Sequence, residues 1–482
     1  MFFTVWNPNM STLPDIKQNF SEWYNEVIYL AELADQSPVR GCIVIRPYGY
    51  AIWEHIKDSV DSRIKATGHE NAAFPIFIPE SFLKREAKHV EGFSPELAVV
   101  THAGGKELEE PLVVRPTSET IIHYMFAQWL KSWRDLPIKI NQWANVVRWE
   151  MRTRPFLRTT EFFWQEGHTA HETYEEAHEE ALTMMREYVS LAQDELAIPV
   201  VSGRKSESEK FPGADITYTF EALMQDGKAL QMGTSHMISQ AFAHSFEMKF
   251  QDRDGNQAYP HLTSWAVTTR LIGAVVMIHG DEKGIVIPPR VAPIQVVIIP
   301  IKRKDDDEAL LAAALASIVQ QCKDAGIRYH VDNDDTKTPG AKFYKWELKG
   351  VPMRLEIGPR DVANKQAVLV RRYNGEKTTV AIESIGNTIT TTLNDIQDAM
   401  FKRAHERRQQ MWYKEAKLKD FGGKLDDQPG FYQTGWCGDL VCEQQLKEYK
   451  ATTRCLLTET TFKECFVCDK PNKHDVLVAK AY

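Results

Sequence analysis

The chain has 482 residues, of which 43% are hydrophobic and 26% are charged, and its formal net charge is −8. This length predicts about three domains, and the composition is that of an ordinary globular protein, which excludes global disorder. The acidic balance excludes a protein that coats nucleic acid by bulk charge, although a local basic face stays open.

The N-terminal stretch MFFTVWNPNMST contains neither a basic segment nor a sustained apolar core, so we expect no signal peptide. No part of the sequence holds the ~20 apolar residues that a membrane-spanning helix needs. The default expectation is therefore a cytoplasmic protein with no membrane partner.

Two helices and a short strand are predicted near the start of the chain. Apolar residues at helical spacing predict a helix over Ser21–Leu33 and a second helix from Tyr48 to Ile64. The run Phe74–Pro79, bounded by prolines, predicts a short strand. Periodicity alone fits an ordinary core helix and edge strand equally well.

The run RPTSET at residues 115–120 precedes an amphipathic helix predicted over Ile121–Trp133. A hydroxyl residue followed by a glutamate is a common signal for a helix N-terminus, which is the simple explanation. A carboxylate beside a hydroxyl would also suit a secondary ammonium group, which donates two hydrogen bonds.

The most informative stretch is residues 148–168, RWEMRTRPFLRTTEFFWQEGH. Arg148–Glu150 is predicted to be a strand that places its arginine and glutamate on one face. After a loop with further arginines, an aromatic strand is predicted over Glu161–Trp164. Arginines neutralise phosphates, an aromatic ring stacks on a base and a carboxylate accepts from an exocyclic amine. The stretch therefore predicts a nucleotide triphosphate pocket, with a solvated surface hairpin as the alternative.

Two later segments carry weaker signals. The hexamer QMGTSH at residues 231–236 is predicted to be a strand end and turn, with Gly233 allowing close backbone approach. Residues 265–277 are predicted to lead into an apolar helix with Arg270 at its start. An arginine there opposes the helix dipole, which makes sense if a polyphosphate binds at the same place. Paired prolines at 288–289 mark a linker.

From Val291 to Gln410 the pattern changes to alternating strands and helices, which predicts an α/β domain with a mixed or parallel sheet. A basic helix is expected to end this segment. The predicted strands are Gln295–Ile301, Ile327–Val331, Val351–Ile357, Gln366–Arg372 and Thr378–Ile382, and the predicted helices are Asp306–Asp324 and Phe343–Leu348.

Five of the seven cysteines lie between Cys437 and Cys468, and in a cytoplasmic chain such clustering favours a metal site over disulfides. Two close pairs, Cys437 with Cys442 and Cys465 with Cys468, suit a tetrahedral structural Zn²⁺. Cys455 could replace one of these ligands, and a set of reduced core cysteines is the alternative.

Residues 148–168 resemble motif 2 of class II aminoacyl-tRNA synthetases, and NQWANVVRWE with PFLRTTEFFWQEGHTA resembles the prolyl-tRNA synthetase family. The N-terminal helix and strand resemble motif 1, the RPTSET run resembles the amino-acid pocket, and residues 265–277 resemble motif 3. The resemblance extends over nearly the whole chain. The interval between His168 and Gln231 is too short for the large editing domain of bacterial-type relatives. The resemblance, with this short interval, therefore implies the eukaryotic and archaeal type of the family, without editing in cis.

The resemblance implies three domains. These are an α+β catalytic domain built on an antiparallel sheet (residues 1–290), an α/β anticodon-binding domain (291–410) and a small zinc-binding α+β domain (411–482). It also implies ATP-dependent attachment of L-proline to tRNA(Pro) in two steps through prolyl-adenylate. Mg²⁺ would accompany ATP, a structural Zn²⁺ would bind the cysteines, and motif 1 would build a homodimer.

The resemblance assigns residues to each substrate, with Arg148 and Arg270 as catalytic residues. The implied ATP-binding residues are Arg148, Glu150, Arg158, Thr159, Phe162, Gln231, Thr234, Thr268 and Arg270. The implied proline-binding residues are Thr117, Glu119, Arg148, Trp164, Glu166, His168 and His236. The implied anticodon-binding residues are Glu347, Arg354 and Arg360, and the zinc ligands are Cys437, Cys442, Cys465 and Cys468.

Two other functions fit parts of this pattern. The first is a synthetase for another amino acid, such as threonine or glycine, on the same architecture; cysteine could also enter a proline-sized pocket. The second is a catalytically silent synthetase-like protein that only binds RNA or a partner. The presence of Arg148, Glu150, Arg158 and Arg270 argues against the silent protein.

Overall fold

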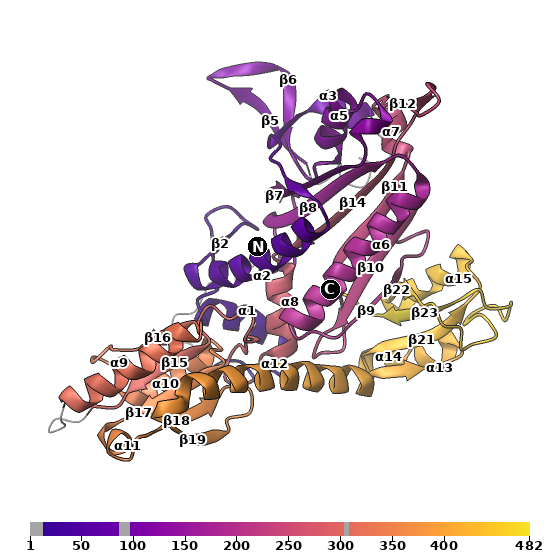
Figure 1. Ribbon diagram of the computed structural model, residues 1–482. Helices are drawn as coiled ribbons and strands as arrows, with labels where there is room; N and C mark the ends of the chain where they lie inside the picture. The colour runs from indigo at the N-terminus through magenta and orange to yellow at the C-terminus, as the bar shows by residue number, and fades with distance from the viewer. Residues whose placement is uncertain (1–12, 86–96, 303–307) are drawn as a thin grey trace.

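A long sheet runs from the N-terminal half of the chain into its C-terminal segment, as the computed structural model shows (Figure 1). The structure describes residues 13–85, 97–302 and 308–482, so the N-terminal stretch MFFTVWNPNMST lies outside it. Within the described ranges this sheet has eleven strands, and its neighbours are antiparallel except for the β3–β7 and β20–β21 pairs at its two edges. The predicted antiparallel α+β fold is confirmed.

The strands of this main sheet come from distant parts of the chain. In spatial order they are β20 (Trp412–Lys414), β21 (Phe431–Trp436), β23 (His474–Ala479), β22 (Thr452–Leu456), β9 (Val200–Arg204), β10 (Ile216–Leu223), β11 (Ala229–Ser239), β14 (His261–Thr268), β8 (Glu161–His171), β7 (Ile138–Val147) and β3 (Glu70–Asn71). The interval between His168 and Gln231 is therefore filled by the end of β8, helix α6 (Tyr174–Ser190), strands β9 and β10 and the start of β11.

Helix α6 (Tyr174–Ser190) covers one face of the main sheet. Its Tyr188 hydroxyl donates a hydrogen bond to Gln165 Oε1 of β8 (2.5 Å). Because side chains alternate along a strand, Trp164 and Glu166 on either side of Gln165 point to the opposite face. That opposite face carries the cavity described below.

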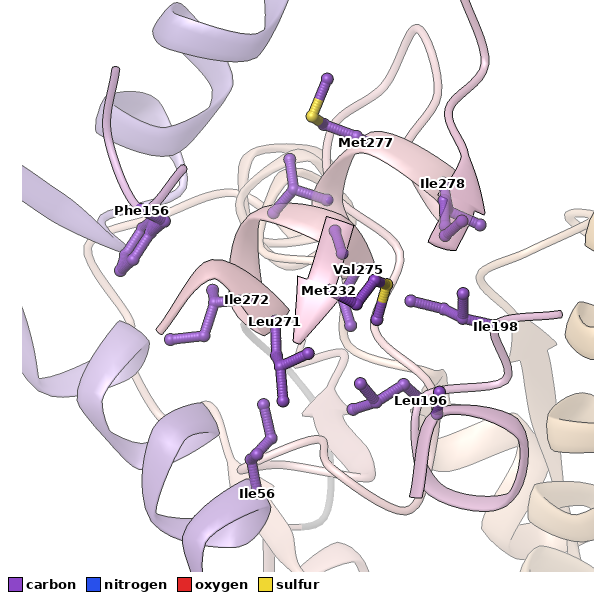
Figure 2. Packing of buried hydrophobic residues seen from close by; sticks show 14 of the residues in the cluster. Ile56, Phe156, Leu196, Ile198, Met232, Leu271, Ile272, Val275, Met277 and Ile278 are labelled. Carbon is purple, nitrogen blue, oxygen red and sulfur yellow. The ribbon is translucent and has the colours of Figure 1, made fainter. Parts of the chain in front are cut away.

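A buried aliphatic cluster fixes helix α8 (Arg270–His279) against the sheet. Figure 2 shows Ile56, Ile198 and Met232 gathered around this helix, and none of the three is more than 2% exposed. Each such side chain contributes about 1.5–3 kcal/mol when it leaves water, so the cluster holds the start of α8 in place. The predicted N-terminal helices are confirmed, and the helices in this cluster are α1 (Phe20–Leu30), α2 (Pro47–Ala66) and α8 (Arg270–His279).

The predicted strand Arg148–Glu150 is wrong, because β7 ends at Val147. The Arg148 N–H still donates to the Thr160 carbonyl (2.8 Å). The Glu150 carboxylate then accepts from the backbone N–H of Arg152 (3.1 Å), and this local turn ends the pairing. The hairpin between β7 and β8 therefore opens where the arginines begin.

The hexamer at residues 231–236 lies inside β11, so the prediction of a strand end and turn is wrong. Gly233 pairs with Phe220 of β10 on one side and Val267 of β14 on the other. A Cβ at this position would lie 2.7 Å from Phe220 Cε1. The glycine therefore serves close packing between strands, and no turn is involved.

A smaller antiparallel sheet, in the order β4–β6–β5, lies at one end of the main sheet (Figure 1). The predicted strand over Phe74–Pro79 begins only at Phe77. The Phe74 carbonyl accepts a hydrogen bond from the Arg115 guanidinium (2.7 Å), so it is not available for pairing with a neighbouring strand. The elements here are β4 (Phe77–Pro79), α3 (Glu80–Arg85), β5 (Ala98–Ala103), β6 (Lys106–Val114), α5 (Glu119–Trp129), α7 (Ala241–Ser245), β12 (Phe250–Gln251) and β13 (Gln257–Ala258). The predicted helix over 121–133 corresponds to α5.

The segment after the paired prolines forms a mixed sheet in the order β16–β15–β17–β18–β19, which confirms the α/β prediction. Strands β16, β15 and β17 are parallel, and β17, β18 and β19 are antiparallel. Asp306, the predicted first residue of helix α9, lies outside the described residues. The elements are β15 (Val296–Pro300), α9 (Glu308–Asp324), β16 (Tyr329–Val331), α10 (Pro339–Leu348), β17 (Met353–Ile357), α11 (Pro359–Ala363), β18 (Gln366–Arg371), β19 (Lys377–Ala381) and α12 (Ile385–Gln410).

The C-terminal strands join the main sheet where Leu456 of β22 pairs with Arg204 of β9. A buried ion cluster reinforces this junction: Glu221 lies 3.0 Å from Lys205 Nζ and 2.8 Å from an Arg454 guanidinium nitrogen. Short helices α13 (Leu418–Phe421), α14 (Lys424–Asp427) and α15 (Leu440–Gln444) complete this unit. In the described ranges, no helix combines the length and apolar character needed to cross a bilayer.

Candidate active site

Every residue predicted to bind ATP or proline lines one cavity of about 460 Å³ on the open face of the main sheet. Strands β8, β11 and β14 form its floor, and the β7–β8 loop and the starts of α5 and α8 form its walls. These lining residues are Thr117, Glu119, Arg148, Glu150, Arg158, Thr159, Phe162, Trp164, Glu166, His168, Gln231, Thr234, His236, Thr268 and Arg270.

The cavity has two chemically different ends, which we name by their residues. The histidine end comprises Thr117, Glu119, Trp164, Glu166, His168 and His236. The arginine end comprises Arg148, Glu150, Arg158, Thr159, Phe162 and Arg270.

At the histidine end, Glu166 is the centre of a buried hydrogen-bond network. Its carboxylate accepts from Gln142 Nε2 (2.7 Å) and from the Ser118 hydroxyl, and lies 3.1 Å from His168 Nε2. Burial alone would raise the pKa of this carboxyl, but hydrogen bonds from His168, Ser118 and Gln142 hold it below its ordinary value. Glu166 is therefore a fixed carboxylate.

His236 is held neutral on the other side of this end. Its Nδ1 lies 2.9 Å from the Thr217 hydroxyl and its Nε2 lies 2.9 Å from the Thr234 hydroxyl. Burial, with His168 nearby, lowers the pKa of His236 to about 3. The Phe211 ring packs against the imidazole with ring centroids 4.7 Å apart.

Two polar atoms at this end are buried without a hydrogen-bond partner in the described residues: Trp164 Nε1 and His168 Nδ1. Such groups are costly unless something satisfies them. The Thr117 hydroxyl donates to the Glu119 carboxylate at the same end. A small polar ligand would find both donors and carboxylates here.

Arg148 lies where the two ends meet. Its guanidinium carbon is 5.5 Å from the Phe162 ring centroid and 5.6 Å from the Trp164 ring centroid, and its Nε donates to the Pro116 carbonyl (2.9 Å). These contacts hold the planar head of Arg148 against two aromatic walls, one from each end of the cavity.

Arg270 begins helix α8 and is anchored by its neighbours. Its Nε donates to the Leu157 carbonyl (3.1 Å) and a terminal nitrogen donates to the Gln231 carbonyl (3.0 Å). Its backbone N–H donates to the Thr268 hydroxyl (3.0 Å). Burial, together with Arg158 and Arg148, lowers the pKa of Arg270 to about 10. The arginine end thus concentrates positive charge that an anion would stabilise.

Glu150 and Arg158 form the outer wall of the arginine end, 3.7 Å apart. The Thr159 hydroxyl donates to the Glu161 carbonyl (2.7 Å), so this side chain is tied to the hairpin backbone. The Phe162 ring meets Trp164 edge-on, with centroids 6.0 Å apart. A flat ring, a carboxylate and a guanidinium therefore face one space.

Several lining residues were missed by sequence reasoning. The loop between β9 and β10 contributes Glu209, Lys210, Phe211 and Pro212, and β14 contributes Ser264 and Ala266. Ser264, Ala266 and Thr268 are every second residue of β14, so they share one face of the sheet. Because Thr268 was predicted to lie in the site, this alternation could have identified Ser264 and Ala266. The loop has no such signal, because only the pairing of β9 with β10 brings it over the cavity.

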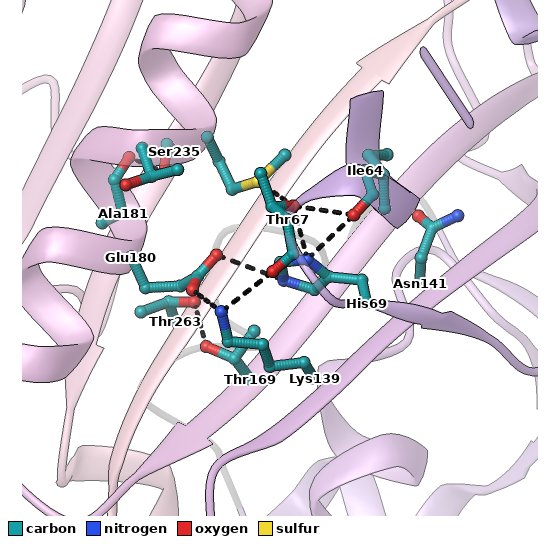
Figure 3. A network of polar contacts seen from close by, with 12 residues as sticks. Ile64, Thr67, His69, Lys139, Asn141, Thr169, Glu180, Ala181, Ser235 and Thr263 are labelled. Carbon is teal, nitrogen blue, oxygen red and sulfur yellow. Dashed lines mark hydrogen bonds and ion pairs between the residues drawn. The ribbon is translucent and has the colours of Figure 1, made fainter. Parts of the chain in front are cut away.

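A polar network on the back of the sheet supports the floor of the cavity (Figure 3). Glu180 of α6 lies 2.6 Å from Lys139 Nζ and 3.2 Å from His69 Nε2. Burial would raise the pKa of Glu180, but its contacts with His69 and Lys139 lower it to about 2. The hydroxyls of Thr169 and Thr263, 2.5 Å apart, link β8 to β14 in the same network.

The three predicted anticodon residues do not form one cluster. Arg354, only 9% exposed, lies 2.9 Å from Glu356 and 3.6 Å from Glu347, and its guanidinium stacks 4.1 Å from the Phe343 ring centroid. Arg360 is exposed on α11, and among the described residues neither Glu347 nor Arg354 forms an ion pair with it.

Four of the clustered cysteines meet in space: Cys437, Cys442, Cys465 and Cys468 have all sulfurs within 4.8 Å of one another. The Cys437 sulfur is 3.8 Å from that of Cys442 and 3.7 Å from that of Cys468. Tetrahedral thiolates at the usual Zn–S distance would be roughly 3.8 Å apart, so the four sulfurs fit a metal ion. Cys455 lies outside the cluster, buried in β22, and burial raises its pKa to about 12.

Family models match the chain in three consecutive parts. Residues 100–279 match the class II tRNA synthetase core domain (G, H, P, S and T), residues 295–392 match an anticodon binding domain, and residues 418–482 match the prolyl-tRNA synthetase C-terminal domain.

Curated proteins and solved structures are similar over nearly the full length. The chain is 50% identical over 473 residues to the proline–tRNA ligase of Acetoanaerobium sticklandii, with 98% of each chain covered. It is 49% identical over 470 residues to proline–tRNA ligase 2 of Clostridioides difficile, with 97% of each covered.

Two crystal structures of prolyl-tRNA synthetase from Cryptosporidium parvum are also similar. The complex with halofuginone and AMPPNP has 41% identity and a TM-score of 0.94, covering 97% of this chain and 99% of that one. The complex with L-proline and AMP has 39% identity and a TM-score of 0.92, covering 98% and 99%. The chain therefore belongs to the prolyl-tRNA synthetases, the class II proline–tRNA ligases, with the C-terminal domain typical of their eukaryotic and archaeal type.

Proposed function

We propose that the cavity activates L-proline with ATP and that the resulting prolyl-adenylate then charges tRNA(Pro). The observation that carries this assignment is the position of Arg148 between Phe162 and Trp164, at the junction of the two ends of the cavity. A two-pronged guanidinium there can bind the proline carboxylate and the α-phosphate together.

In the first step, a carboxylate oxygen of proline attacks the α-phosphorus. A new oxygen–phosphorus bond forms, the bond to the oxygen that bridges to the β-phosphorus breaks, and inorganic pyrophosphate leaves with that electron pair. The step needs little acid–base chemistry, so positioning and charge neutralisation carry the catalysis. Arg148 and Arg270 are the proposed catalytic residues, and Mg²⁺ accompanies ATP as the counter-ion of its phosphates.

Proline is assigned to the histidine end. Its secondary ammonium donates two hydrogen bonds, which suits the Thr117–Glu119 pair and the fixed Glu166 carboxylate. Trp164 supplies a rigid wall for the ring. The neutral imidazole of His236 closes the pocket without adding like charge beside the ammonium, and the buried His168 ring completes the wall.

ATP is assigned to the arginine end. Phe162 stacks on adenine and Glu150 accepts from its exocyclic amine. Arg158 and Arg270 bind the phosphates. The other assigned ATP contacts come from Thr159, Gln231, Thr234 and Thr268, which line the same cavity.

In the second step, a ribose hydroxyl of the terminal adenosine of tRNA(Pro) attacks the prolyl carbonyl carbon, and AMP leaves. The unit with the mixed sheet would read the anticodon, with Glu347, Arg354 and Arg360 as the proposed contacts to unstacked bases. Replacing any of these three should raise the KM for tRNA(Pro) and leave tRNA-independent activation of proline unchanged.

One assay tests the activation step and its specificity. Pyrophosphate exchange into ATP should depend on proline and remain at background with threonine or glycine. Exchange that depends on another amino acid, or no exchange at all, would overturn the assignment. We also propose that the chain has no editing activity in cis, which persistent hydrolysis of alanyl-tRNA(Pro) by the pure protein would contradict.

The four-cysteine cluster is proposed to hold a structural Zn²⁺. The purified chain should contain about one zinc per chain. Cys468→Ser should lose the metal and destabilise the C-terminal unit, whereas Cys455→Ser, a buried cysteine outside the cluster, should retain it. Full zinc content in Cys468→Ser would exclude this ligand set.

Domain boundaries near residues 290 and 410 and a homodimer are also proposed. The boundaries are supported by the gaps between the three family matches. The dimer is supported by large apolar side chains near the smaller sheet that are almost half exposed: Phe77, Val99 and Trp129. Sedimentation that shows only monomer at micromolar concentration would refute the dimer.

A further inference from the structure

A second cavity, of about 350 Å³, adjoins the arginine end. Leu157, Arg158 and Arg270 line both cavities, so these three side chains form the wall between them. The other lining residues come from the β7–β8 loop, from the start of β11 and from the last residues of the chain: Arg152, Thr153, Arg154, Lys228, Leu230, Ala481 and Tyr482.

The lining of this second cavity is strongly basic. Five of its side chains are cationic: Arg152, Arg154, Arg158, Lys228 and Arg270. No aspartate or glutamate side chain is among the described lining residues. Two acids pair with the cations from outside the lining: Asp226 lies 2.9 Å from Lys228 Nζ, and Glu150 lies 3.7 Å from Arg158. The cavity therefore keeps an excess of positive charge, which favours a multivalent anion.

Among the described lining residues of the second cavity, Tyr482 supplies the one aromatic ring, and two cations contact this ring. The Arg154 guanidinium and the Lys228 ammonium both lie 5.1 Å from the Tyr482 ring centroid. Arg154 also donates to the Ser21 hydroxyl (2.7 Å). Since a nucleotide needs a free ring face and an acceptor for its base, this cavity suits bare phosphate groups and no base.

We propose that this cavity is a subsite for inorganic pyrophosphate, distinct from the position of the ATP phosphates. The inference rests on the proposed function, since activation of proline releases pyrophosphate beside Arg158 and Arg270. Pyrophosphate that moves past these two arginines enters the second cavity, where Arg152, Arg154 and Lys228 supply further N–H groups as hydrogen-bond donors. Pyrophosphate held in the second cavity lies away from the reacting atoms, which disfavours its attack on the α-phosphorus of prolyl-adenylate in the reverse reaction.

Direct binding tests whether the subsite is separate. Inorganic pyrophosphate is titrated calorimetrically into the full chain saturated with AMPPNP in the absence of proline, at constant Mg²⁺, so that no adenylate can form. The wild type should bind about one pyrophosphate per chain, and the double variant Arg152→Gln/Lys228→Gln should bind it about tenfold more weakly, because two charge-assisted contacts are lost. Binding that occurs only when pyrophosphate displaces AMPPNP would overturn the proposal.

Lys424→Gln is the matched control. Lys424 is 47% exposed and 2.8 Å from Glu415, and Lys228 is 43% exposed and 2.9 Å from Asp226, so both substitutions remove a similar surface ion pair. The control should bind pyrophosphate as the wild type does. Equal weakening in the control and the double variant would show a general charge effect and would also overturn the proposal.

Kinetics separate this proposal from its rivals. In proline-dependent exchange without tRNA, the double variant should raise the KM for pyrophosphate about tenfold and the KM for ATP by less than about twofold. A raised KM for tRNA(Pro) with an unchanged KM for pyrophosphate would assign the cavity to the tRNA backbone instead. Absence of exchange in the wild type would overturn the proposed function itself, whereas normal exchange with no effect of the variants overturns only the subsite.

Discussion

The two ends of the main cavity differ in how their charged side chains are balanced. At the histidine end, the Glu166 carboxylate is satisfied by Ser118, Gln142 and His168 before any ligand arrives. At the arginine end, Arg148, Arg158 and Arg270 lie close enough that the first two help to lower the pKa of the third. One end is internally balanced, and the other carries mutual repulsion.

Under the proposed assignment of proline to the histidine end and ATP to the arginine end, the difference follows from the chemistry of the two substrates. Proline is a small zwitterion, so its pocket needs fixed partners and little net charge. ATP carries several negative charges, so its proposed pocket gains most when arginines are held together and the ligand relieves the repulsion that remains beside the Glu150–Arg158 pair. Changes at the arginine end should therefore affect the reaction itself, and changes at the histidine end should mainly affect the amino acid.

The largest effect is expected from Arg148→Ala, which removes the contact between the two ends. Proline-dependent exchange should fall about 10³-fold in kcat/KM, because a preorganised donor to the transition state is lost. Arg148→Lys keeps the charge but loses the two-pronged guanidinium, so its kcat/KM should still be at least about tenfold below that of the wild type. Arg186→Ala, an exposed arginine on α6 that pairs with Glu179, serves as the control. Activity near the wild-type level in Arg148→Ala would refute the central role of this residue.

A matched pair of substitutions tests the division between the ends. Glu166→Gln places an amide where Ser118 and Gln142 donate hydrogen bonds, so the KM for proline should rise about 30-fold and the KM for ATP by less than about twofold. Glu150→Gln should show the opposite pattern. Steady-state exchange with each substrate varied in turn measures both constants. If both variants raised both constants equally, the cavity would not be divided as described.

The hairpin turn at Gly41 provides a smaller test at the arginine end. The Gly41 carbonyl accepts from the Thr160 N–H (2.8 Å), and Thr160 in turn pairs with Arg148. Gly41 has φ +82°, and a Cβ would overlap the Thr160 hydroxyl and lie 2.8 Å from Thr153 Cγ2. Gly41→Ala should therefore displace the β7–β8 loop and raise the KM for ATP about tenfold, measured by exchange.

Gly68→Ala is the control for backbone strain. Gly68 has φ +87°, and a Cβ there would meet nothing within 4 Å. This variant should lose about 1 kcal/mol of stability and keep its KM for ATP. Equal KM values in Gly41→Ala and Gly68→Ala would mean that the turn does not position the loop.

Residue patterns predicted the cavity better than they predicted its local structure. The arginines and aromatics of residues 148–168 predict a nucleotide pocket from their chemistry alone, and the predicted residues do line one cavity. The same residues suggested a strand through Glu150, but the turn between Glu150 and Arg152 ends it at Val147. Alternation cannot show a turn that a side chain makes with a nearby backbone N–H.

Features created by distant pairing were the hardest to predict. Gly233 suggested a turn, although packing against Phe220 explains the glycine. The loop with Phe211 reaches His236 only because β9, β10 and β11 are neighbours in the sheet. In contrast, the spacing of Cys437, Cys442, Cys465 and Cys468 predicted a cluster that the fold does bring together. Close spacing in sequence restricts where ligands can lie, whereas contacts made through sheet neighbours, such as that of Phe211 with His236, have no local signature.

The smallest effect concerns the pH dependence of stability, to which His236 of the histidine end should contribute. The pKa of buried His236 is about 3, while an unfolded histidine titrates near 6.5, so between these values only the unfolded chain takes up the proton. The resulting stability is fully present above pH about 6.5 and decreases as the pH falls, by about 1.4 kcal/mol per pH unit for one such histidine. Because the unfolded histidine is only half protonated at pH 6.5, His236→Asn should lose about 1 kcal/mol less than the wild type between pH 6.5 and 5.5, measured by urea unfolding. His279 has the same low pKa but lies away from the cavity, so His279→Asn should flatten the slope equally while leaving the KM for proline unchanged. An unchanged slope in His236→Asn would show that this imidazole is not held neutral, and the histidine end would then share the uncompensated charge of the arginine end.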